Sequence, residues 1–143
     1  MKSQEVTVYR EIQRNTEMAM KAMETMSDKV YDDNLARQIS GQSLKYSELH
    51  NEAVKQLVES KAELYRGNHL ADMMLKAGIQ YNTMLNTSTG HIAELMIKGS
   101  NMGILEMEKV LHHNTEAGEK STALARQLID LEENSVQRLK DYL

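Results

Sequence analysis

Apolar residues recur at steps of three and four along almost the whole chain, the spacing of an α-helix that buries one face. The repeat is most regular near the N-terminus, where it runs without interruption from Tyr9 to Val30, as in the inner seam of a helix bundle. No segment alternates apolar and polar residues in the way that marks a β-strand. The pattern predicts helices over residues of about 3–29, 34–66, 70–86, 89–113 and 116–142.

Turn-forming residues separate these predicted helices. Asp32 and Asp33 are suitable N-caps, Gly67-Asn68 is a typical helix end, and Asn114-Thr115 interrupts the C-terminal part. The short third helix has an apolar face that we expect to be buried, made of Leu70, Met73, Met74, Ala77, Tyr81 and Met84.

The segment from His91 to His113 is the most apolar, because it carries two lines of apolar residues instead of one. The first line is Ala93, Ile97, Ser100, Ile104, Met107 and Leu111. The second line is Ile92, Met96, Gly99, Gly103 and Val110. Together the lines cover an arc of roughly 220° on a helical wheel, wider than the stripe of an ordinary surface helix. We therefore expect this helix to be covered from two directions.

The second line indicates a close contact. A glycine inside a helix costs roughly 1 kcal/mol relative to alanine, so Gly99 and Gly103 suggest that another backbone approaches there. The neighbour is either the 70–86 helix, another bundle helix or a second copy meeting the same patch in a homodimer. Glu106 lies on this side, and we expect it to pair with Lys109, His113 or a basic group of another chain. The predicted interface set is Ile92, Met96, Gly99, Gly103, Glu106 and Val110.

The order and lengths of the predicted helices resemble the ferritin-like superfamily. The resemblance covers the whole chain and implies a single all-α domain over residues 1–143, a four-helix bundle with a short extra helix in the connection between the second and third long helices. In that layout the middle connection crosses the bundle. The alternative is an up-down-up-down bundle in which the 70–86 segment caps one end.

The resemblance also raises the question of a metal site. Ferritin-like di-iron proteins use a Glu on each of two helices and Glu-x-x-His on the other two. This sequence lacks that motif; Glu132, for example, is followed three positions later by Ser135. A carboxylate site for iron or manganese stays open as an alternative, although we expect glutamates flanking the seams to face solvent. Its candidate ligands are Glu17, Glu24, Glu48 and Glu132.

Composition narrows the classes of function. The chain has 143 residues, a net charge of −4, no Cys, Pro, Trp or Phe, and eleven Met, which we interpret as adaptable core filler rather than thioether ligands for Cu(I). No cluster of basic residues favours nucleic-acid binding, and no apolar run reaches the length of a membrane span. The absence of cysteine and of a signal-peptide pattern favours a cytoplasmic location.

No motif identifies an enzyme: the scattered glycines form neither a phosphate-binding loop nor a nucleophile elbow. The sequence leaves the biochemical activity open. The favoured interpretation is a non-catalytic, self-associating structural or interaction module. The first alternative is a divergent ferritin-like metal-binding bundle. The second is a small-molecule binder with an internal cavity, lined by Thr16, Gln42, Tyr46, Tyr81, Ser100 and Ser135.

Overall fold

A computed structural model describes residues 1–143, apart from the side chains of Leu70, Met84 and Leu85. The described chain is all-α. Its elements are α1 (Ser3–Met26), the 3₁₀ turn η1 (Ser27–Lys29), α2 (Asp33–Glu59), α3 (His69–Leu85), α4 (Thr89–His113), α5 (Glu119–Leu139) and the 3₁₀ turn η2 (Lys140–Tyr142). None of the described helices is both long and apolar enough to cross a membrane.

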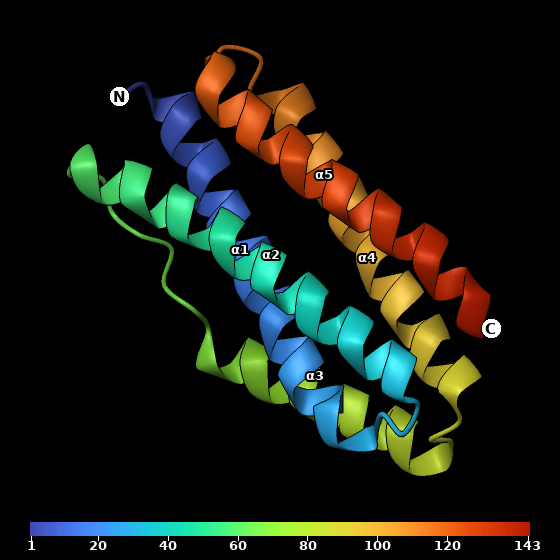
Figure 1. Ribbon diagram of the computed structural model, residues 1–143. Helices are drawn as coiled ribbons and strands as arrows, with labels where there is room; N and C mark the ends of the chain where they lie inside the picture. The colour runs from blue at the N-terminus through green and yellow to red at the C-terminus, as the bar shows by residue number, and fades with distance from the viewer.

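The four long helices pack around one hydrophobic core. α1 pairs with α2 and α4 pairs with α5, while further contacts join α1 to α4 and α5 and join α2 to α5. Figure 1 shows the segment after α2 returning along the bundle through α3, which lies beside α1, so that α2 and α4 run in the same direction. The middle connection therefore crosses the bundle, and the up-down-up-down alternative does not describe the chain.

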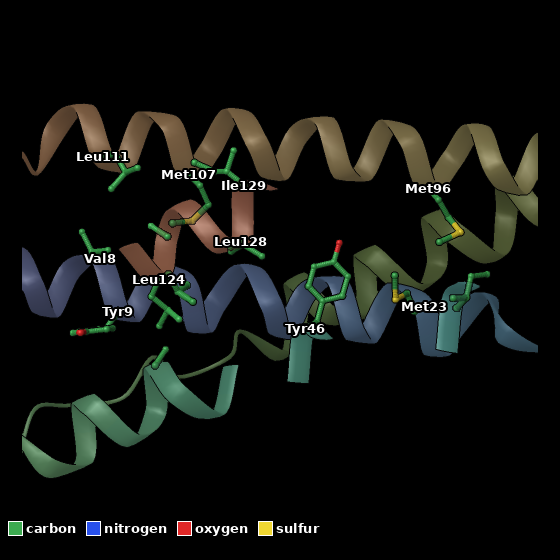
Figure 2. Packing of buried hydrophobic residues seen from close by; sticks show 14 of the residues in the cluster. Val8, Tyr9, Met23, Tyr46, Met96, Met107, Leu111, Leu124, Leu128 and Ile129 are labelled. Carbon is green, nitrogen blue, oxygen red and sulfur yellow. The ribbon is translucent and has the colours of Figure 1, made fainter. Parts of the chain in front are cut away.

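The seams predicted for the long helices form this core. Along α1, Tyr9, Ile12 and Met23 are buried, as the uninterrupted repeat predicted. Figure 2 shows part of the packing, with side chains from α1 and α4 meeting between the helices. The fully buried large side chains are Val8, Ile12, Thr16, Leu35, Tyr46, Leu57, Thr83, Ile92, Met107, Ser121, Leu128 and Leu139.

α2 ends at Glu59, whereas the apolar pattern predicted a helix as far as Arg66. The cause is a turn in which Lys61 adopts a left-handed conformation with φ 54°. The Ala62 N–H then donates to the Leu57 carbonyl across 2.9 Å, the closing bond of a Schellman motif. A lysine at this position gives no glycine-like signal, so the sequence pattern could not reveal the end of the helix.

The crossing connection is held against α1 by two polar contacts. The buried Gln13 side chain accepts from the Tyr65 N–H across 2.8 Å and donates to the Tyr65 carbonyl across 3.2 Å. Further along, Lys21 forms an ion pair with Asp72 in the first turn of α3. These contacts place α3 along α1.

α3 buries a different face from the one predicted. Met73, Met74 and Tyr81 expose 55%, 68% and 65% of their surface, and Ala77 is exposed too. Leu75, Ile79 and Thr83 form the inward side. Leu70 and Met84, also predicted for the buried face, lie outside the described side chains. The two faces of this short helix are both apolar enough that periodicity alone did not distinguish them.

α5 begins at Glu119 instead of Glu116. Gly118 precedes it with φ 90°, a left-handed conformation that favours glycine. The Glu116 N–H donates to the Gln4 side chain across 2.8 Å, which ties the preceding loop to the start of α1.

Candidate functional site

A cavity of about 460 Å³ lies between α1, α3 and α4. Its walls are mostly apolar, and six of the eleven methionines line it: Met18, Met23, Met26, Met74, Met96 and Met102. In Figure 2 the side chains of Met23 and Met96 extend toward one another from α1 and α4, and the Tyr46 hydroxyl points toward α4. The methionines thus gather around one space, which their sequence positions did not indicate.

Two glycines leave the cavity open. Gly78 on α3 and Gly99 on α4 both line it and are exposed, and neither has a neighbouring atom within 4 Å of the place where a Cβ would lie. Side chains at these two positions would narrow the space between the helices. The glycine side of α4 therefore faces a solvent-accessible groove at Gly99, rather than the close backbone contact that the sequence suggested.

The floor of the cavity is polar and is built from α2, α4 and α5. Glu132 of α5 exposes only 4% of its surface. The hydroxyls of Tyr46 and Ser100 lie near its carboxyl group, where they favour the charged form. Gln42 Nε2 in turn donates to the Tyr46 hydroxyl across 2.9 Å. Four side chains from three helices thereby form one buried polar cluster.

Gly103 explains how a carboxyl group fits beneath α4. A Cβ at this position would lie 3.1 Å from Glu132 Oε1, closer than ordinary van der Waals contact. The mid-helix glycine therefore makes room for the Glu132 side chain. One of the expected explanations, close packing against a neighbouring bundle helix, holds at this glycine.

Burial dominates the electrostatics of the cluster. Removal from water raises the pKa of Glu132, and the nearby hydroxyls of Tyr46 and Ser100 only partly oppose that change. Burial also raises the pKa of Tyr46, and the nearby Glu132 charge adds to the effect. The cluster thus favours the protonated forms of both acids.

Two oxygen atoms of the cluster have no hydrogen-bond partner. They are Glu132 Oε2 and Gln42 Oε1, and both are buried from solvent. A buried polar atom that is left unpaired costs free energy, so it usually finds a partner in the folded protein, in water or in a ligand. A ligand that donates hydrogen bonds to these two atoms would remove that free-energy cost.

Glu106 lies at the edge of the cavity and forms an ion pair within the chain. Its Oε2 is 2.7 Å from Arg14 Nη2 on α1, and Arg14 also binds Glu11 across 2.8 Å. Burial lowers the pKa of Arg14, but the two carboxylates outweigh burial and raise it. Within the chain, Glu106 therefore pairs with neither Lys109 nor His113, because α1 brings Arg14 to this side of α4.

The residues of the predicted interface do not form one surface. Ile92 and Met96 expose 0% and 6% and are buried inside the single chain, and Val110 is partly buried against the core. Gly103 contacts Glu132, as described above. Only Gly99 of the set is exposed. Self-association stays a prediction, and these residues do not supply its contact surface as a group.

The four candidate metal ligands lie apart. Glu17 binds His50 Nε2 across 3.0 Å between α1 and α2, Glu24 and Glu48 are exposed, and Glu132 lies in the buried cluster. Among the side chains that the structure describes, no three of His, Asp or Glu gather in a way suited to holding a metal ion. The expectation that Glu132 faces solvent is wrong, because its side chain extends from α5 to the space left by Gly103 on α4.

The predicted cavity lining is correct in part. Gln42, Tyr46 and Ser100 do line the cavity. Thr16 instead returns a hydrogen bond to the Ile12 carbonyl across 2.8 Å. Tyr81 is exposed, and Ser135 lines a separate polar groove between α2 and α5.

Comparison of the chain with protein-family models, with curated proteins and with solved structures finds no match. Any assignment of function therefore rests on the chemistry of the cavity.

Proposed function

We propose that the protein binds a small, largely apolar molecule in the cavity between α1, α3 and α4. The observation that carries the proposal is an open, methionine-lined space with a buried polar cluster at its floor. Ligand sites are typically concave spaces of roughly 300–1,000 Å³ with apolar walls and a few placed polar groups. The cavity matches that description in size and in chemistry.

The methionine walls support the same proposal. Methionine is unbranched and has three rotatable bonds, so its side chain adapts to the shape of a neighbour. Met18 and Met102 are exposed at the cavity by 37% and 64%. These side chains lose water contact when an apolar molecule enters, and that loss favours binding.

The test is a titration of the protein, labelled with ¹³C at its methionine methyl groups, with 1-octanol. We expect resonances of the six cavity methionines to shift in a saturable way. Met107 is the matched control, because it is fully buried on α4 and does not line the cavity. Shifts that are absent, or that include Met107 as strongly as Met96, would contradict the proposal.

Self-association is a second candidate. Met102 and Leu105 of α4 expose 64% and 56%, and α3 exposes Met73, Met74 and Tyr81. Such exposed apolar side chains favour an interface when they lie together. Sedimentation of the chain, whose mass is 16.3 kDa, separates a dimer from a monomer. A monomer at every concentration tested would rule out self-association.

The helix order supports a ferritin-like layout, which we propose for the fold. Its basis is the crossing connection that makes α2 and α4 parallel (Figure 1). The metal-binding alternative has less support, since the described side chains lack a suitable ligand group. Metal analysis of protein purified without chelators tests it: stoichiometric iron or manganese would revive that alternative.

A further inference from the structure

The buried cluster presents hydrogen-bond acceptors that lack donors. Glu132 Oε2 and Gln42 Oε1 are both unpaired, and both residues line the cavity beside Tyr46. The two free acceptors therefore lie in the same polar cluster at the floor of the cavity. A group that fits this site carries at least two donors, and a positive charge complements the carboxylate.

The other charged groups of the cavity are already paired. Glu106 of α4 binds Arg14, and Lys98 of α4 lies 3.2 Å from Glu94. The described lining residues of α1 and α3 carry no charged side chain, and the titratable lining groups of α2 and α5 are Tyr46 and Glu132. Among the lining residues that the structure describes, Glu132 is thus the one carboxyl group without a cation.

We propose that the ligand is a primary alkylamine, whose ammonium group binds Glu132 Oε2 and Gln42 Oε1 while its hydrocarbon part lies among the methionines. This inference rests on the proposed function and names its ligand class. A primary ammonium has three N–H donors and a compact positive charge, which suits two acceptors in a confined space. Flexible methionine side chains move aside to admit it.

Binding of the amine releases a proton from the site. Burial raises the pKa of Glu132, so the carboxyl group of the empty cavity retains its proton to a higher pH than an ordinary glutamic acid. The ammonium stabilises the carboxylate, so the Glu132 proton leaves to the buffer as the ion pair forms. A neutral alcohol produces no such release.

The experiment compares octylamine, 1-octanol and octanoate by calorimetry. One charge-assisted contact contributes about 1.5–3 kcal/mol, so we expect octylamine to bind roughly 10- to 100-fold more tightly than octanol. Octanoate is expected to bind more weakly than octylamine, because a carboxylate offers no N–H donor to Glu132 Oε2 and Gln42 Oε1. Titrations at about pH 5, just above the ordinary glutamic acid range, in two buffers of different ionisation enthalpy measure the released proton in the unmodified protein.

Two variants test the assignment to Glu132. Glu132→Gln is expected to abolish the preference for octylamine over octanol. Glu133→Gln is the matched control, because Glu133 is the adjacent residue of α5 and is exposed; it is expected to keep the preference. If Glu132→Gln fails to fold, proton release in the unmodified protein decides the question.

The outcomes separate the two proposals. Equal affinity for octylamine and octanol, without proton release, would overturn the amine assignment and leave the cavity as an apolar binding site. A preference for the amine that survives Glu132→Gln would also overturn it. Binding of neither compound would refute the proposed function itself.

Discussion

Replacement of Glu132 by Gln changes how stability depends on pH. In the folded protein burial raises the pKa of Glu132 above its unfolded value of about 4.3. The folded state therefore holds this proton more tightly than the unfolded state, and the resulting stability is fully present below the unfolded pKa. It is lost as pH rises through the folded pKa, and above that value the contribution is constant.

The size of the effect follows from proton linkage. One group changes the free energy of unfolding by at most about 1.4 kcal/mol per pH unit between its two pKa values. Glutamine has a nearly identical shape but no proton to lose. Glu132→Gln therefore removes the part of the free energy of unfolding that falls as pH rises. The stability of the variant relative to the unmodified protein is therefore expected to increase with pH across that window.

Urea denaturation at a series of pH values measures this difference directly. Subtracting the two curves cancels the other carboxylates, which both proteins share. Glu133→Gln is the matched control for the loss of one carboxyl group, because Glu133 is the adjacent residue of α5 and is exposed. A flat difference curve for Glu132→Gln, or one that falls with pH, would refute the placement of Glu132 in a desolvated site.

Three further results are expected from matched changes elsewhere in the chain. Gly99→Ala should raise the free energy of unfolding by about 1 kcal/mol, because the new methyl group enters open space. Gly103→Ala should lower it, because the new Cβ would lie 3.1 Å from Glu132 Oε1. Thermal melts that rank the two variants in the opposite order would contradict this packing. Lys61→Gly should raise stability by about 1 kcal/mol by relieving the left-handed residue of the α2 end, and urea titration showing a loss would disprove the cap. Glu106→Gln should lower the free energy of unfolding by less than about 1 kcal/mol, since the ion pair with Arg14 is partly solvated. It should also leave the sedimentation coefficient unchanged. A change of oligomeric state would show that Glu106 acts between chains.

Periodicity predicted the long helices because their inner faces are chemically distinct from their outer faces. On α1, Tyr9, Ile12 and Met23 are buried as the repeat indicated. The same reasoning failed on α3, where Met73 and Tyr81 are exposed and Ile79 packs against the core. Helical spacing identifies the buried face only when one face is apolar and the other polar. A helix that is apolar on two sides does not reveal which side is buried.

The site was harder to predict than the fold, because it depends on which helices become neighbours. Glu132 stands beside the α5 seam, where a glutamate normally faces water. Its burial follows from Gly103 on α4, which leaves room for the carboxyl group. The available signals in the sequence were a glycine in the middle of one predicted helix and a glutamate beside the seam of another. Nothing in the sequence alone showed that α4 and α5 bring these two positions together.

A crystal structure of the complex with 8-bromooctylamine tests the central claim most directly, because the anomalous signal of bromine locates one end of the ligand. The account predicts a bromine peak among the methionines of the cavity, with the amine nitrogen within hydrogen-bond distance of Glu132 and Gln42. An empty cavity at saturating ligand, or an amine that points to the opening beside Gly99 while Glu132 stays unpaired, would contradict it.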